Sequence, residues 1–265
     1  LVTASLAMAA DGDYESSQGV SFVALNALLM RRYMYEYDLV EEAFAPFSIN
    51  AHHNALTNPN AMFHRALKLE DFKKARMVAD PISVLDSSPI CDGAAALILS
   101  RSENLNGSGA RATRIAASAI ATDSLAVSTR RDPVWLRAAE LSAAKAYAQA
   151  NLKPADVDLF ELHDAFAIMA PMSIEAAGFT PRGTGVYLAR DGEIGLNGKL
   201  PVSTFGGLKA RGHPIGASGV YQLVEAVTQV RGEAGANQVP DARVAMTQSL
   251  GGVASTAVTH ILVGS

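Results

Sequence analysis

Three segments in the second half of this chain hold the residues best suited to chemistry. The densest is residues 206–219, Gly-Gly-Leu-Lys-Ala-Arg-Gly-His-Pro-Ile-Gly-Ala-Ser-Gly, where five glycines surround His213 just before a predicted helix. Glycine lets the backbone approach a ligand, and a helix N-terminus offers free N–H groups to an anion or a developing oxyanion. A flexible turn with a surface histidine is the competing interpretation of such a loop.

The second segment is residues 161–166, Glu-Leu-His-Asp-Ala-Phe, where a predicted strand ends and a helix begins. Polar residues at the carboxyl ends of strands commonly face a ligand crevice in layered α/β folds. There His163 could donate a hydrogen bond to a carbonyl oxygen or take up a proton near neutral pH. Taken alone, a helix-capping Asp164 beside a structural His163 explains the segment equally well.

The third segment is residues 248–252, Gln-Ser-Leu-Gly-Gly, which also follows a predicted strand. Paired glycines can expose N–H groups to an oxyanion. Alone, a Gly-Gly pair after a strand is usually a turn.

The elements that must position these segments alternate between helices and short strands. Apolar residues recurring at three and four predict a helix over residues 20–37, and a turn-rich loop over 50–64 precedes a short polar helix over 69–78. Further helices are predicted over residues 132–150, where Asp132 and Pro133 provide the start signal, 165–177 and 220–230. Strands are predicted over residues 1–10, 93–100, 113–122, 157–162, 244–248 and 257–263. This alternation indicates an α/β protein built in layers, with the best domain boundary at residues 101–109.

Composition excludes several classes of function. The chain has 265 residues, 49% hydrophobic and 18% charged, with a formal charge of −4 and no basic run that could follow a nucleic-acid backbone. It has neither an 18-residue apolar run free of breaks nor a signal-peptide pattern, so we expect a soluble cytoplasmic protein without a membrane partner. Cys91 is the single cysteine, which leaves no internal disulfide and no cysteine-based metal site.

In this order, the three segments resemble the C-terminal half of the thiolase superfamily, in its sterol-carrier-protein-type and archaeal branch. Gly212-His213-Pro214 matches the Gly-His-Pro motif, residues 163–166 match the His-Asp-Cys-Phe motif, and residues 249–252 match the last glycine-rich turn. Upstream, residues 58–63 resemble the loop-domain motif, and residues 88–96 resemble the Asp-Gly-Ala-Ala-Ala strand. The resemblance therefore covers nearly the whole chain.

The resemblance implies a layered α/β/α thiolase-like fold with a complete C-terminal half, a partial N-terminal half and an irregular helical loop domain. Residues 1–10 would be the last part of a strand of the N-terminal half, and residues 87–104 its closing strand. Residues 11–86 would form the loop domain, and residues 105–265 the C-terminal domain.

The resemblance also implies roles for single residues. His213 would activate a cysteine nucleophile and, with His163, form the oxyanion hole for the thioester oxygen. The Gly251 N–H would help form a second hole, while Ser88 and Gly207 would contact coenzyme A, with Ser88 at its pantetheine arm. Coenzyme A and acyl-CoA would be substrates, with no permanently bound cofactor and no metal.

Two departures from the family pattern matter. Thiolases use a second cysteine as acid and base, but Ser249 and Ala165 stand at its two usual positions, and neither shuttles a proton as a thiol does. The nucleophilic cysteine is expected before the strand that residues 1–10 resemble, so this chain alone is expected to be inactive.

Cys91 matches a non-catalytic position and is interpreted as a structural thiol. Histidines 52 and 53 either line a coenzyme A entrance or lie on the surface of a polar loop.

Three functions remain open. The leading one is acyl transfer between coenzyme A thioesters, by Claisen condensation or thiolysis of 3-oxoacyl-CoA, as in an acetyl-CoA acetyltransferase of lipid metabolism. A thiolase-like retro-aldolase is the second, although such relatives carry tyrosines in place of His163 and His213. The third is a degenerate acyl-CoA-binding subunit. The resemblance further suggests a homo-oligomer, a dimer or tetramer, and a partner that is either an OB-fold zinc-ribbon protein or a synthase.

Overall fold

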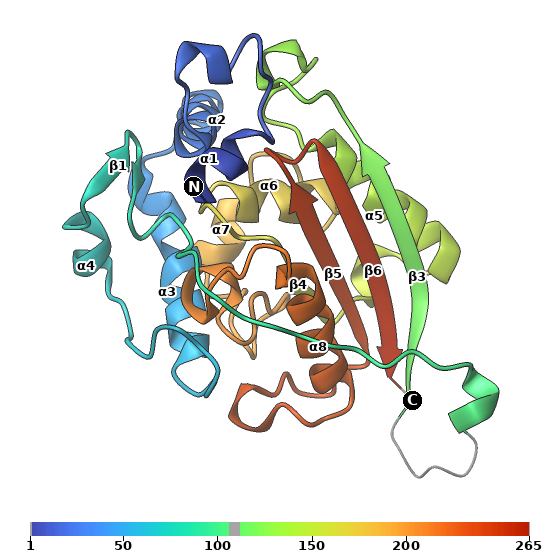
Figure 1. Cartoon of the computed structure of the whole chain (residues 1–265). Helices are drawn as coiled ribbons and strands as arrows, with labels where there is room; N and C mark the ends of the chain where they lie inside the picture. The colour runs from blue at the N-terminus through green and yellow to red at the C-terminus, as the bar shows by residue number, and fades with distance from the viewer. Residues whose placement is uncertain (1, 106–111, 265) are drawn as a thin grey trace.

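A mixed sheet of four strands lies at the centre of the second half of the chain in this computed structural model, which describes residues 2–105 and 112–264 (Figure 1). The strand order is β3-β6-β5-β4, with β3 antiparallel to β6, β6 antiparallel to β5, and β5 parallel to β4. The carboxyl ends of β4 and β5 therefore meet at one edge of the sheet. The strands are β3 (Thr113–Thr122), β4 (Leu159–Glu161), β5 (Val244–Gly251) and β6 (Thr256–Gly264).

Helices cover both faces of this sheet. Helix α5 (Arg137–Ala150) packs on β3 and β6, whereas α8 (Ser218–Val230) packs mainly on β5. Successive residues of a strand point to opposite faces, and Ala245 shares a core cluster with Ala226 of α8 while Met246 belongs to the cluster that holds the buried face of α5. The layered α/β/α fold predicted from the sequence is confirmed.

The two covering helices contact the sheet through different kinds of side chain. On α5, the buried residues are alanines and one serine at spacings of three and four, so that helix lies close to the sheet. On α8, the buried face includes polar side chains, and the Gln222 side chain donates to the carbonyls of Glu161 and Gln248 at 3.1 and 3.2 Å. Gln222 therefore ties α8 to the ends of β4 and β5, where the site lies.

The first third of the chain is mainly helical and packs beside the sheet, as Figure 1 shows for α2 and α3. Helix α2 begins where the Ser21 hydroxyl accepts a hydrogen bond from the Ala24 N–H at 3.1 Å. A single large core cluster joins α2 to α5, to α6 and to the sheet. The remaining elements are α1 (Val2–Ala7), η1 (Ser16–Gln18), α2 (Phe22–Tyr37), η2 (Glu41–Phe44), α3 (Ala45–Ala55), α4 (Leu69–Lys73), β1 (Met77–Ala79), β2 (Ile82–Ser83), η3 (Ser102–Leu105), η4 (Val127–Thr129), η5 (Pro154–Asp156), α6 (Met169–Ala176), α7 (Gly185–Arg190), η6 (Gly207–Arg211) and η7 (Gly235–Asn237).

Two strand predictions are wrong. Residues 1–10 contain helix α1 in place of a strand, because an alanine-rich segment without a neighbouring strand satisfies its backbone locally. Residues 93–100 are extended but unpaired among the described residues, and Ile98 is 98% exposed. The trace after β2 crosses in front of α8 in Figure 1 instead of joining the sheet.

Several predicted boundaries also move. The loop predicted over residues 50–64 begins inside α3, and the helix predicted over 69–78 ends at Lys73, before β1. Asp132 does not start α5, which begins at Arg137, and α6 begins at Met169. Within the predicted boundary at residues 101–109, residues 106–109 lie outside the described part, and the four-part domain division stays a prediction. No helix in the described ranges is long and apolar enough to cross a membrane.

Candidate active site

The two histidines predicted to act together are in contact. His163 follows β4 and His213 precedes α8, and their ring centroids lie 5.2 Å apart with the ring planes at 87°. The Nδ1 atom of His213 is 2.7 Å from the Ser218 hydroxyl, whereas the Nδ1 atom of His163 is buried without a hydrogen-bond partner in the described chain. The predicted convergence of these two loops is confirmed.

Both imidazoles are held in the neutral form. Burial lowers the pKa of His163 to about 3, with smaller contributions from His213 and the Arg211 cation. Burial, and then Arg211, lowers the pKa of His213 to about 4. At neutral pH each ring therefore has one N–H donor and one nitrogen lone pair, the combination that a base or an oxyanion donor needs.

A short extended segment, residues 87–90, clamps the two histidine loops together. The Ser88 N–H donates to the Ala165 carbonyl at 2.8 Å, and the Pro89 carbonyl accepts from the His213 N–H at 3.0 Å. Ser88, predicted as a coenzyme A contact, thus lies beside the loop that carries His163. Sequence reasoning found this segment as a motif but missed the clamp, because its contacts are made by backbone atoms of distant loops.

A buried aspartate fixes the backbone of the glycine-rich loop. Asp164 accepts from the Leu208 N–H at 2.7 Å, so it binds η6, a π-helical turn, instead of capping the helix that follows it. Gly207 lies against this carboxylate at φ +52°, and an added Cβ would come within 2.5 Å of the Asp164 Oδ2 atom. The contact of Gly207 with coenzyme A stays a prediction, and in the structure the Asp164 carboxyl is the group that approaches this glycine.

A buried arginine and a buried glutamate face each other at the end of the same loop. The Arg211 Nε atom is 3.4 Å from the Glu225 Oε1 atom, and both side chains are at most 7% exposed. The Arg211 guanidinium also stacks over the Tyr221 ring, 4.8 Å from its centroid. Burial raises the pKa of Glu225 to about 8, with Arg211 opposing and Glu161 and Asp164 adding to the shift.

The third segment reaches the same region. Gly251 ends β5 opposite Thr256. Ser249, on the same strand, lies against Gly219, since a Cβ added to Gly219 would be 3.3 Å from the Ser249 Oγ atom. Gly219 follows Ser218, the partner of His213, so the three segments are joined.

Cys91 also borders the glycine-rich loop. A Cβ added to Gly212 would lie 2.7 Å from the Cys91 sulfur, so the thiol packs on the backbone just before His213. Within the described residues, no three His, Cys, Asp or Glu side chains gather into a site that could hold a metal ion.

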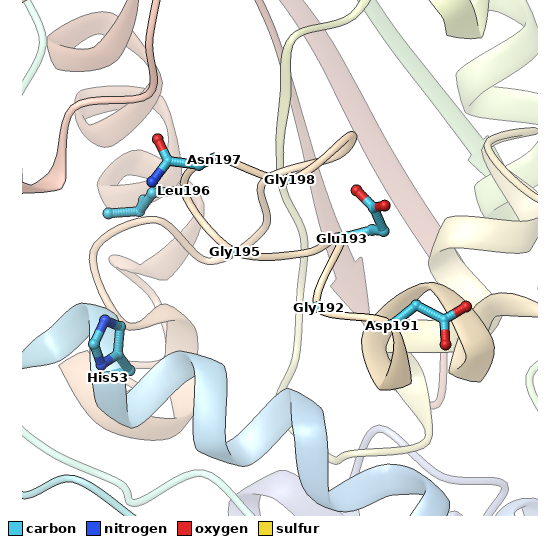
Figure 2. Close-up of a pocket in the computed structure, with 8 residues that line it drawn as sticks. All are labelled: His53, Asp191, Gly192, Glu193, Gly195, Leu196, Asn197 and Gly198. Carbon is cyan, nitrogen blue, oxygen red and sulfur yellow. The ribbon is translucent and has the colours of Figure 1, made fainter.

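A separate cavity of about 440 Å³ opens beside α3, lined by His53 and by residues 191–193 and 195–198 (Figure 2). Figure 2 shows the carboxylates of Asp191 and Glu193 on one side of it and His53 on the other. Neither His163 nor His213 lines it, and two carboxylates oppose binding of the phosphates of coenzyme A. His52 is buried, with its Nδ1 atom 3.0 Å from the Arg65 carbonyl oxygen, and stacks on Phe63.

Comparisons with known proteins agree with this architecture. The family described as thiolase C-terminal domain-like matches residues 119–264. The acetyl-CoA acetyltransferase of Methanothermobacter thermautotrophicus is 42% identical over 98% of this chain and 68% of its own length. Rat (Rattus norvegicus) sterol carrier protein 2 is 35% identical over 88% of this chain, which spans 44% of that relative's length.

A solved structure shares the fold as well. The Ltp2-ChsH2(DUF35) aldolase superposes with a TM-score of 0.80 and 25% identity, over 91% of this chain and 63% of that one. The sheet order, the paired histidines and the glycine-rich loops define a layered α/β protein with a two-histidine site. The chain belongs to the thiolase superfamily, in the branch of the archaeal acetyl-CoA acetyltransferases and sterol carrier protein 2.

Proposed function

We propose that this protein transfers acyl groups between coenzyme A thioesters by the thiolase mechanism, as an acetyl-CoA acetyltransferase or a close variant. The observation that carries the proposal is the contact between two neutral histidines at the ends of separate elements, 5.2 Å apart between ring centroids. A thiolate forms when a neutral imidazole takes the thiol proton, and aimed N–H donors lower the energy of a thioester oxyanion.

In this proposal, His213 is the base and His163 is the second donor of the oxyanion hole. The Gly251 N–H would serve the second hole and Ser88 the pantetheine arm, with coenzyme A as substrate and not as a resident cofactor. The proposal does not assign the nucleophile to Cys91, because Cys91 stands at a different position in the family pattern. A soluble homo-oligomer is part of the same proposal.

The test is acetyl exchange between acetyl-CoA and labelled coenzyme A, using the form of the protein that carries the nucleophile. His213→Ala should lower the exchange rate by more than a factor of about a hundred, since one lost oxyanion donor alone costs roughly 10²–10³. Circular dichroism should show an intact fold. Near-normal turnover in this variant would end the assignment.

The exchange assay should be paired with a condensation assay, because the two reactions need different groups. Exchange needs the nucleophile and one base, whereas condensation also needs a group that removes a proton from the acetyl carbon. Ala165 and Ser249 replace that group at both usual positions, so we expect exchange to run faster than condensation.

A thiolase-like aldolase is the second candidate. It is favoured by the TM-score of 0.80 to the solved aldolase. It is also favoured by Ala165 and Ser249 at the two usual positions of the second cysteine, since retro-aldol cleavage does not use an acylated cysteine. The retained histidines oppose it. Release of an aldehyde or ketone from a 3-hydroxyacyl-CoA, without acetyl exchange, would establish the aldolase and exclude the acyltransferase.

A further inference from the structure

The Ser218 hydroxyl is buried against His213 at the start of α8. Ser218 is 1% exposed, its Oγ atom lies 2.7 Å from the His213 Nδ1 atom, and the Pro214 carbonyl oxygen lies 3.4 Å away on the preceding turn. Neither the family motifs nor the proposed roles assign a task to this side chain. A hydrogen bond to one ring nitrogen determines which tautomer of a neutral histidine is present.

The two contacts of Ser218 favour one direction of that bond. A hydroxyl has one hydrogen to donate, and the Pro214 carbonyl can only accept. If the hydrogen points to Pro214, the bond to His213 must run from Nδ1–H to the hydroxyl oxygen. In the opposite arrangement the Ser218 hydrogen would point to His213, and the Pro214 carbonyl oxygen, which also accepts from the Ala217 and Ser218 N–H groups at 2.7 and 3.0 Å, would lie 3.4 Å from the hydroxyl oxygen without a hydrogen from it.

We propose that Ser218 is a positioning residue that holds His213 as the Nδ1–H tautomer and leaves Nε2 as the basic nitrogen. This inference rests on the proposed role of His213 as the base. In the proton-transfer step, Nε2 takes the proton of the nucleophilic thiol, the sulfur keeps the electron pair as a thiolate, and Nδ1–H remains bonded to Ser218. The same proton then leaves from Nε2 to the thiolate of the departing coenzyme A, so the ring ends in its starting tautomer.

The ring environment agrees with a neutral base before the reaction. Burial and the nearby Arg211 cation disfavour the imidazolium, as the lowered pKa of His213 shows. Without Ser218 the ring would keep its place in the loop, because the His213 backbone N–H is still held by the Pro89 carbonyl. It would lose the bond that selects one tautomer.

The experiment is nitrogen-15 NMR of the histidine-labelled protein at pH 7, with the His213 signals assigned by their loss in His213→Gln. We expect a protonated Nδ1 and an unprotonated Nε2 in the wild type. Ser218→Thr, which keeps the hydroxyl, should preserve this pattern, and Ser218→Ala should move the signals toward a mixture of tautomers. Thr228→Ala is the matched control, since this hydroxyl on the same helix donates at 2.8 Å to the carbonyl of Val224 and lies in the last turn of α8, far from His213 in the sequence.

Kinetics supply a second measurement. In Ser218→Ala we expect kcat of acetyl exchange to fall about tenfold to a hundredfold with KM unchanged, which is less than a full general-base contribution of roughly 10²–10⁴. Ser218→Thr should restore most of the rate. An Nε2–H tautomer in the wild type, or an unchanged tautomer in Ser218→Ala, would overturn the proposal. A protein that shows the expected tautomers but no exchange would instead refute the proposed function alone.

Discussion

The neutral histidine pair predicts how the stability of the protein depends on pH. In the unfolded chain a histidine has a pKa near 6.5, whereas burial brings His163 to about 3 and His213 to about 4 in the folded protein. Between these values the unfolded state binds protons that the folded state does not, so stability rises with pH and is lost as the pH falls below about 6.5.

The expected loss of stability per histidine follows from the difference between pH 5 and the histidine pKa in the unfolded chain. Both folded pKa values lie at or below about 4, so at pH 5 the folded protein keeps both rings neutral. The loss from pH 7 to pH 5 is one and a half pH units at about 1.4 kcal/mol each, roughly 2 kcal/mol per histidine. This figure hardly changes if either folded pKa is displaced by half a unit.

The assay is urea unfolding at pH 7 and pH 5 for the wild type, His163→Asn, His213→Asn and the double variant. Each single variant should lose about 2 kcal/mol less than the wild type on acidification, and the double variant about 4 kcal/mol less. Other groups also titrate with folding, since burial lowers the pKa of His52 and His260 and raises that of Glu225, but they are present in all four proteins. A single variant with the full pH dependence of the wild type would show that its histidine is already charged at pH 5 in the folded protein.

Three further predictions concern the loop that carries His213. Gly207→Ala should destabilise the protein by about 1–3 kcal/mol in thermal unfolding, because its φ is +52° and the added Cβ meets a carboxylate, whereas Gly216→Ala, with nothing within 4 Å, should be neutral. Arg211→Met should cost more stability at pH 9 than at pH 7, because the Glu225 carboxyl, with its pKa raised to about 8, is mostly protonated at pH 7 and pairs with Arg211 as a carboxylate at pH 9; adding Glu225→Gln should remove this pH dependence. Cys91→Ser should leave acetyl exchange unchanged, and loss of exchange would identify Cys91 as the nucleophile.

The sequence predicted most of the C-terminal domain because its elements carry local signals. β3 was predicted with its observed bounds, and α2 and α8 follow their apolar spacing closely. The contact between His163 and His213 was predicted from the order of two motifs that each follow or precede an element of the layered fold. In these segments the local sequence pattern and the tertiary packing favour the same structure, so the pattern alone was sufficient to predict the helices and strands.

The features that were predicted wrongly or missed all depend on contacts between segments that are distant in the sequence. The apolar run at residues 93–100 has the composition of a buried strand, but a strand forms only where a neighbouring backbone accepts and donates its hydrogen bonds. The clamp made by residues 87–90 is the reverse case, in which backbone atoms without a sequence signal bind two distant loops. Asp164 was weighed as a helix cap because the sequence places a helix after it, and only the fold brings Leu208 within 2.7 Å of its carboxylate.

The groups at the site narrow the proton chemistry that the protein can perform. Around the two histidines lie the hydroxyls of Ser218 and Ser249 and the thiol of Cys91, which packs against Gly212. A serine hydroxyl is too weak an acid to shuttle protons as a thiol does, so the neutral imidazoles, each with one nitrogen lone pair, are the groups at this site able to accept a proton from a thiol and return it. One base is enough to form and release a thiolate, which is the requirement of acyl exchange. Condensation also needs a group that removes a proton from the acyl carbon, and the two usual positions of that group hold Ala165 and Ser249. Condensation therefore depends, more than acyl exchange does, on a group that these residues do not supply.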